Sequence, residues 1–304
     1  MLSPLYLDSE EIKRDTKRMK EFVQLSQTLI IYCHDTLDLP TSDKLLDIFG
    51  KMVINSFSVC DTEMRPIGVG LYLGASVLDH SCSPNVVVMF TGTRATVRCI
   101  KTFSMYKEGP IMDQLMLATC CPNSQCSGAI IDRNGKLSCL MCRKDSSSDI
   151  YRNSRTLCLE KVAETISSIK QLQNVQDKHP HVILEKCENC LSNYNDVLHK
   201  NNMYAIKLKE MAFDSCIDME EWKKALQYGE DLLNGYRQYY DINHPLLGVH
   251  LMKLGKLSAY LDILTDAKDY FLQAHCVLLI THDRDGALYR ELTELLSQLT
   301  AELG

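Results

Sequence analysis

The second half of the chain limits its fold most strongly, because from Tyr151 onward the sequence has only helical periodicity. Apolar residues recur there at three- and four-residue spacing in seven segments, which polar or turn-forming residues separate. These segments are residues 154–176, 181–200, 203–217, 220–240, 245–262, 265–280 and 285–302. The pattern predicts an all-α domain built from consecutive helices.

A degenerate internal repeat runs through these helices. Ala225 and Ala267 lie in matching segments 42 residues apart. Leu254-Gly255, Ala267, Phe271 and Ala274 have the spacing of the tetratricopeptide motif. We therefore expect a tetratricopeptide-like domain in which Phe271 and Ala274 are buried between units. Stacked repeats of this kind present a concave face that binds partner proteins.

The first hundred residues mix helical and strand patterns. Residues 9–35 predict one amphipathic helix, and residues 42–54 predict a second one after a break at Leu39-Pro40. A β-hairpin is predicted over residues 86–103, with Thr91-Gly92-Thr93 as its turn.

Between these patterns, residues 67–85 run from a glycine-rich segment into a polar cluster that contains His80, Cys82 and Asn85. A loop between two apolar segments is a place where a scaffold holds functional side chains. A tight surface turn capped by Ser81 and Asn85 explains the same composition. The residues alone leave both interpretations open.

This stretch resembles the second half of a SET domain, in the form found in the SET-and-MYND protein lysine methyltransferases. The residues in register are Gly68, Gly70, Leu71, Tyr72, Ser76, Leu78, His80, Ser81, Cys82, Pro84 and Asn85. Residues 55–60 also resemble the family's Asn-Ser-Phe segment. The chain departs from the family at Leu73, usually proline, and at Asp79, usually asparagine. The resemblance covers about residues 5–107 and 115–304.

The resemblance implies an α+β fold, in which a partial SET domain of β-strands and a helical insert precedes the tetratricopeptide-like domain. The expected parts are a helical SET insert (1–60), the C-terminal half of the SET core (61–107), a cysteine-rich zinc-binding segment (108–149) and the helical domain (150–304). A polar stretch at residues 144–149 is expected to link the last two.

The implied activity is S-adenosylmethionine-dependent protein (histone) lysine N-methylation, in the cytoplasm and nucleus. By position, the cofactor contacts implied are Asn55, Ser76, Asp79 and His80. Phe57 and Ser58 would line the channel for the substrate lysine. An ionised aspartate only accepts hydrogen bonds, whereas asparagine also donates them, so Asp79 is expected to weaken cofactor binding.

Several family parts are missing from this sequence. The family orients the substrate amine with a tyrosine in an Ile-Ser-Tyr segment that precedes a C-x-C-x2-C triplet. Residues 105–114 contain neither the segment nor the triplet, and Tyr106 lies too early to be that tyrosine. No Cys/His array of a MYND finger precedes Cys33 in these residues, and we expect no N-terminal half of the SET domain. We therefore expect weak or lost cofactor binding and impaired catalysis, and assign no catalytic residue. The alternative is a non-catalytic scaffold that binds proteins through its helical domain.

Four of the fourteen cysteines have metal-ligand spacing. Cys121 and Cys126 are separated from Cys139 and Cys142 by the turn-forming residues 132–135. Two short pairs on either side of a hairpin can place four thiolates around Zn²⁺ at about 2.3 Å. A reduced, cysteine-rich loop is the alternative, and Cys120 could replace Cys121 as a ligand.

The other cysteines are expected to be free thiols. We predict core positions for Cys33, Cys158, Cys216 and Cys276, a mixture of core and surface for Cys187 and Cys190, and a buried thiol for Cys82.

The charge and hydropathy of the sequence limit the classes of partner that the chain is expected to bind. The net charge of −6 argues against broad nucleic-acid binding through phosphates. No apolar run reaches the roughly 20 residues that cross a bilayer, and residues 1–9 do not have the pattern of a signal peptide. The expected partners are histones or other lysine-containing protein substrates, and proteins that bind the helical domain.

Overall fold

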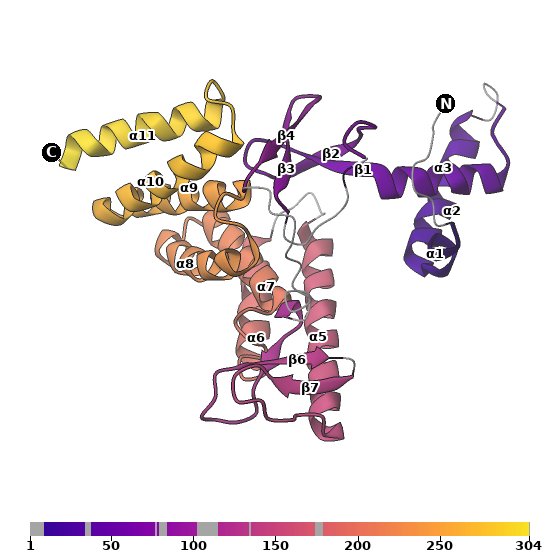
Figure 1. Ribbon diagram of the computed structural model, residues 1–304, viewed down its shortest axis with the longest axis horizontal. Helices are drawn as coiled ribbons and strands as arrows, with labels where there is room; N and C mark the ends of the chain where they lie inside the picture. Colours follow the sequence, from indigo (N-terminus) through magenta and orange to yellow (C-terminus); the bar gives the residue numbers. More distant parts are fainter. Residues whose placement is uncertain are drawn as a thin grey trace. The chain divides into compact units, whose positions relative to one another are not determined.

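The computed structural model describes residues 9–33, 38–76, 78, 84–101, 115–133, 135–173 and 179–303 (Figure 1). The fold is mixed α+β, as expected, with small antiparallel sheets in the N-terminal half and an all-helical C-terminal region. It divides into two compact units, residues 1–80 with 88–97 and residues 81–87 with 98–304. Among the described helices, none is both long and apolar enough to span a membrane.

The first unit begins with three helices, α1 (Ser9–Arg14), α2 (Thr16–Cys33) and α3 (Ser42–Asn55). The single helix expected over residues 9–35 is wrong, because it breaks at Asp15. The Asp15 carboxylate accepts the backbone N–H groups of Lys17 at 3.0 Å and Arg18 at 3.1 Å, and so caps a new helix. Phe22 packs against Phe49 of α3, with ring centroids 5.5 Å apart.

Two antiparallel strand pairs follow. Strand β1 (Ser56–Cys60) pairs with β2 (Pro66–Leu71), so that Phe57 lies opposite Gly70 and Ser58 opposite Val69. Strand β3 (Val86–Thr91) pairs with β4 (Arg94–Cys99) across the turn at Gly92. This second pair confirms the predicted hairpin.

In the residues that the structure describes, the second unit has a small sheet and seven helices. The sheet has the order β5 (Thr119–Cys120), β6 (Ala129–Arg133) and β7 (Lys136–Cys139), with antiparallel neighbours. All seven predicted helices are confirmed, and each packs against the next along the chain (Figure 1). They are α5 (Asp149–Gln173), α6 (Pro180–Asn193), α7 (Met203–Asp218), α8 (Trp222–Tyr239), α9 (Pro245–Tyr260), α10 (Leu264–Thr281) and α11 (Ala287–Leu303).

Helix α6 ends at Asn193, although the pattern predicted helix to residue 200. The chain turns at Tyr194 and runs beside β5, where the Cys120 N–H donates to the Val197 carbonyl at 2.7 Å. The side chain of Asn202 then caps α7 by accepting the Tyr204 N–H at 2.8 Å, and it donates to the Ala118 carbonyl at 2.8 Å. The apolar periodicity therefore continues past Asn193, but the contact with β5 keeps the following residues from being helical.

The repeat positions are buried as predicted. Phe271 is 1% exposed, and Ala267 and Ala274 are completely buried. The Phe271 ring packs so close to Gly255 of α9 that a β-carbon there would lie 2.5 Å from the ring. Glycine at position 255 is therefore required for the close approach of α9 and α10.

One buried histidine makes the stability of this helical region depend on pH. His250 is 5% exposed, and its Nε2 lies 2.7 Å from the Gly229 carbonyl, so Nε2 donates. Burial lowers the pKa of His250 from 6.5 to about 4. Below pH 6.5 the unfolded chain therefore binds a proton that the folded chain does not, and the free energy of unfolding falls as the pH drops toward 4.

Because of this histidine alone, we expect the free energy of unfolding to fall by roughly 2 kcal/mol when the pH is lowered from 7 to 5, since each pKa unit corresponds to about 1.4 kcal/mol. Urea unfolding of the wild type and of His250→Gln at both pH values measures the effect. Glutamine keeps an N–H donor without titrating, so the variant should lose less stability on acidification. Equal losses of stability in both proteins would show that His250 does not cause the pH dependence.

Candidate functional site

The first candidate site lies where α3 meets β1, opposite the turn that follows β2. We call it the Asn55–Ser76 junction. The Ser76 hydroxyl lies 2.8 Å from the Tyr72 carbonyl and 3.3 Å from the Asn55 carbonyl. A hydroxyl has one proton, so the bond to Tyr72 dominates. The junction brings together two of the four residues that the resemblance assigns to the cofactor.

Asn55 is the last residue of α3 and is 6% exposed. Its Nδ2 donates to the Lys51 carbonyl at 2.8 Å, which fixes the amide against its own helix. Within the described part of the chain no hydrogen bond reaches Oδ1, so this oxygen is available as an acceptor. Asp79 and His80, the other two assigned residues, lie outside the described residues, as does Cys82.

An aromatic cluster lies beside this junction. The Tyr72 ring contacts Phe57 edge-on, with centroids 6.2 Å apart, and contacts Phe90 at 5.4 Å. The Tyr72 hydroxyl donates to the Thr93 carbonyl at 3.0 Å. Neighbouring residues of a strand point to opposite faces, so Phe57 faces Tyr72 while Ser58 is exposed on the other face. The sequence reasoning gave Tyr72 and Phe90 no role, because no local pattern indicates contacts between distant segments.

The second candidate is the four-cysteine cluster, formed by Cys121, Cys126, Cys139 and Cys142. Their sulfur atoms all lie within 4.8 Å of one another. The Sγ atoms of Cys121 and Cys142 are 3.7 Å apart, as are those of Cys126 and Cys139. A tetrahedron with metal–sulfur distances of about 2.3 Å has edges of about 3.8 Å, so the donor set fits Zn²⁺.

The backbone around the cluster explains how these thiols converge. The Cys121 N–H donates to the Gly128 carbonyl at 3.0 Å, and the Arg143 N–H donates to the Cys139 carbonyl at 3.1 Å. A β-carbon on Gly128 would lie 2.6 Å from the Cys139 sulfur, so only glycine fits there. Cys120 is not part of the cluster, because its thiol donates a hydrogen bond to the Leu198 carbonyl at 3.3 Å.

The thiols do not share one protonation state. Burial raises the pKa of Cys121 to about 12. Although burial opposes it, the backbone N–H groups of Cys142 and Met141 lower the pKa of Cys139 to about 7. Four sulfur atoms this close cannot all be thiolates without a cation, because their charges repel. A divalent metal removes this conflict by binding the deprotonated sulfurs.

The sheet that carries the cluster is attached to α5. The Tyr151 hydroxyl lies 2.8 Å from the Cys120 carbonyl and 2.9 Å from the Thr119 hydroxyl. A polar linker was expected over residues 144–149. Asp149 instead begins α5, and residues 144–148 run along β7, where the Ser146 N–H donates to the Leu137 carbonyl at 2.9 Å. The cluster is thus part of a folded sheet that contacts the helices.

Most of the remaining cysteines are core thiols. The core positions predicted for Cys33, Cys158 and Cys216 are confirmed. The prediction for Cys276 is wrong, because this residue is exposed and lies away from the buried stripe of α10 that contains Ala274 and Leu278. Cys187 and Cys190 are both buried, so the expected surface thiol is also wrong. Their spacing places them on the same face of α6 as Ile183.

The sequence is similar to one class of protein, the SMYD-type protein lysine methyltransferases. The chain is 30% identical over 271 residues to "Histone-lysine N-methyltransferase SMYD3" of Homo sapiens, covering 88% of this chain. It is 24% identical over 275 residues to "N-lysine methyltransferase SMYD2" of Homo sapiens, covering 85% of this chain. It is 23% identical over 333 residues to "Histone-lysine N-methyltransferase ASHR1" of Arabidopsis thaliana, covering 95% of this chain.

SMYD-family lysine methyltransferases are therefore homologues of this chain over most of its length, as the resemblance predicted. The chain spans 62% of the length of human SMYD3, 61% of human SMYD2 and 67% of ASHR1. No protein-family model matches the sequence.

Proposed function

We propose that this chain has the partial SET core and the helical domain of a SMYD-type, S-adenosylmethionine-dependent protein lysine methyltransferase, with impaired methyl transfer. The observation that carries the proposal is the Asn55–Ser76 junction. It places Ser76 Oγ 3.3 Å from the carbonyl of Asn55, 21 positions earlier, and the resemblance assigns both residues to the cofactor by position. We assign the partial SET core to residues 61–107, after a helical insert at 1–60, and the tetratricopeptide-like domain to 150–304.

The cofactor would supply an electrophilic methyl group, and the chain would position it. Asn55 would offer its Oδ1 as an acceptor, and Asp79 and His80 are proposed as further cofactor contacts from the resemblance. Ser76 fixes the turn against the end of α3. Phe57 and Tyr72 would form an apolar wall that keeps water away from the substrate amine, with Ser58 as a further channel residue. Histones or other lysine-containing proteins are the proposed substrates, in the cytoplasm and nucleus.

The proposed impairment rests on a sequence segment of the family that this chain lacks, the one that orients the amine. Methyl transfer requires the amine and the methyl carbon to be held about 3–3.5 Å apart in line, and a misplacement of about 1 Å can cost about 100-fold. The sequence of residues 105–114 contains no Ile-Ser-Tyr segment and no cysteine triplet, and Tyr106 lies too early to replace that tyrosine. The residue that orients the amine in the family therefore has no counterpart at this position.

We further propose that Cys121, Cys126, Cys139 and Cys142 bind one structural Zn²⁺. The support is the sulfur geometry of the cluster and its closed set of four thiols, which leaves no open position for a substrate. The metal would stabilise the sheet β5–β7 rather than take part in methyl transfer.

A non-catalytic scaffold is the second candidate, and the stacking of α5–α11 favours it. Consecutive helices that pack mainly on their neighbours form extended surfaces suited to binding proteins. Under this alternative the chain would bind partner proteins without using a cofactor.

Calorimetric titration with S-adenosylmethionine, together with radiolabelled methyl transfer to histones, separates the two candidates. We expect binding weaker than micromolar, and transfer at least about 100-fold slower than that of human SMYD3 measured alongside. Ser76→Ala should weaken the remaining binding, because it loosens the junction. Thr28→Ala is the matched control, since Thr28 makes a similar bond to a carbonyl four residues earlier on exposed α2.

Two results would change this proposal. Micromolar affinity, with transfer that disappears in His80→Ala, would contradict impairment and indicate an active enzyme. No detectable binding in any assay, together with capture of a protein partner by the helical domain, would favour the scaffold.

A further inference from the structure

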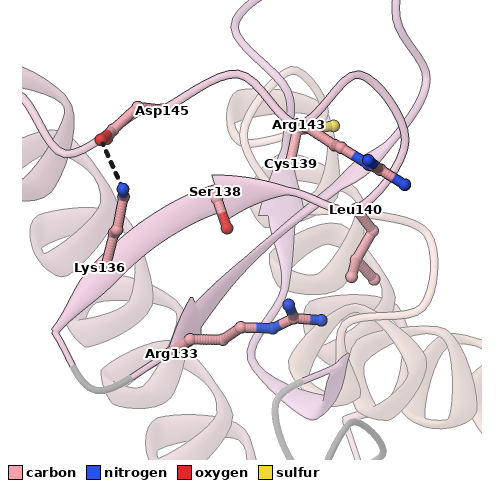
Figure 2. A pocket seen from close by; sticks show the side chains of 7 residues that line it. All are labelled: Arg133, Lys136, Ser138, Cys139, Leu140, Arg143 and Asp145. Carbon is pink, nitrogen blue, oxygen red and sulfur yellow. Dashed lines mark ion pairs between the residues drawn. The ribbon is translucent and has the colours of Figure 1, made fainter.

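A basic pocket lies on the outer side of the β6–β7 hairpin, next to the four-cysteine cluster. It has a volume of about 610 Å³ and is lined by Arg133, Lys136, Ser138, Cys139, Leu140, Arg143 and Asp145. Figure 2 shows Lys136 and Asp145 at one end, Arg143 with Leu140 toward the other, Ser138 between the two ends, and the Arg133 side chain along the lower side. Nothing in the proposed methyl transfer uses this pocket.

We propose that the basic pocket binds an acidic peptide segment of a partner protein, with carboxylates on Arg133 and Arg143 and an apolar side chain on Leu140. Planar guanidinium groups match carboxylates in a two-pronged geometry, which makes arginine well suited to this recognition. The Ser138 hydroxyl lies between the two arginines in sequence and can donate a further hydrogen bond.

The arrangement of charges supports an anionic ligand. Arg133 and Lys136 are directly opposite in the β6–β7 register, and like charges at this position destabilise a hairpin. Asp145 neutralises only the Lys136 charge, through an ion pair at 3.6 Å. Within the described part of the chain, no ion pair is made by the guanidinium groups of Arg133 or Arg143. Three basic side chains and one acidic one leave the lining with a net charge of +2.

The backbone at Arg143 adds a second, independent argument. Arg143 has a φ angle of +59°, in the left-handed region where glycine is favoured. A residue with a β-carbon is unfavourable there by roughly 1 kcal/mol or more, so this turn would fold more easily with glycine. An arginine at this position costs stability and adds a guanidinium group to the rim of the pocket.

A peptide fits the surroundings better than a nucleic acid does. None of the seven lining residues is aromatic, so the pocket offers no platform on which bases can stack. The chain has a net charge of −6, which repels a long polyanion, whereas a short acidic segment meets only the local positive charge. Leu140 and Met141, 37% and 66% exposed, supply an apolar surface at the same turn.

Fluorescence anisotropy tests this proposal on the full chain. The probe is a fluorescein-labelled six-residue peptide of alternating glutamate and leucine, and the control peptide has glutamine in place of glutamate. We expect saturable, salt-sensitive binding of the acidic peptide, and binding at least tenfold weaker for the control peptide. Arg133→Gln and Arg143→Gly should each weaken binding of the acidic peptide at least tenfold.

The variants separate loss of binding from loss of folding. Arg143→Gly places glycine where the backbone favours it, so it should melt no lower than the wild type and keep the same metal content. Arg94→Gln removes an exposed arginine of β4 and should leave binding unchanged. Equal binding of the two peptides, unchanged binding in both pocket variants, or tighter binding of a single-stranded oligonucleotide would overturn the proposal. The assay needs no S-adenosylmethionine, so its failure would leave the proposed methyltransferase function untouched.

Discussion

Replacing Cys139 and Cys142 together by serine should remove the metal from the protein and unfold the sheet β5–β7. The cluster fits one Zn²⁺, and structural zinc contributes about 10–16 kcal/mol to small domains, because a preformed site rarely exists in the unfolded chain. Losing two of four thiolates breaks the tetrahedral site. Metal analysis of the purified protein should give close to one equivalent for the wild type and none for the double variant.

The chain supplies its own matched control for this experiment. Cys120 directly precedes Cys121, but its thiol donates a hydrogen bond to the Leu198 carbonyl and is not part of the cluster. Cys120→Ser should therefore keep the full metal content and a thermal transition close to that of the wild type. Unchanged metal in the double variant, or equal loss in Cys120→Ser, would rule out this set of ligands.

Local signals account for what the sequence predicted correctly. The helices α5–α11 follow from apolar spacing that depends only on near neighbours, and the β3–β4 hairpin follows from two β-rich runs around Gly92. The four-cysteine cluster was also predictable, because two close pairs and an intervening turn bring the thiols together over a short stretch of chain.

The errors come from contacts that the local pattern does not contain. Helix α2 starts at Thr16 because the Asp15 side chain caps it, although apolar periodicity runs through the break. Residues 144–148 are polar, yet their backbone continues the edge of β7. The sequence assigned Cys121 to the cluster but left Cys120 as a possible replacement. Only the hydrogen bond from Cys120 to Leu198, 78 residues away, excludes that replacement.

The candidate cofactor site was predicted by resemblance rather than by physical reasoning. No periodicity relates Asn55 to Ser76, and only the pairing of β1 with β2 brings the end of α3 near the turn after β2. The aromatic contacts of Tyr72 with Phe57 and Phe90 arise in the same way. Such pairings depend on the register between strands. A single sequence specifies this register only weakly when a strand is exposed on both faces, and β2 is such a strand.

Phe271→Ala should lower the free energy of unfolding of the helical region by roughly 3–5 kcal/mol, the usual cost of removing a buried phenylalanine. Phe271 is 1% exposed, and its ring fills the space between α9 and α10. Leu272, its neighbour on the same helix, is 47% exposed, so Leu272→Ala should cost far less. Urea unfolding followed by far-UV circular dichroism measures both.

A double-mutant cycle with Gly255 makes this prediction specific to the α9–α10 contact. In the wild type, Gly255→Ala should destabilise by about 1–3 kcal/mol, because the new β-carbon overlaps the Phe271 ring. In the Phe271→Ala background the ring is gone, and alanine is the better helix former by about 1 kcal/mol, so the same change should stabilise the protein. The sign of the Gly255→Ala effect should therefore reverse between the two backgrounds. If it stays destabilising in both, the penalty does not come from the Phe271 ring, and the packing of the repeat is not as described.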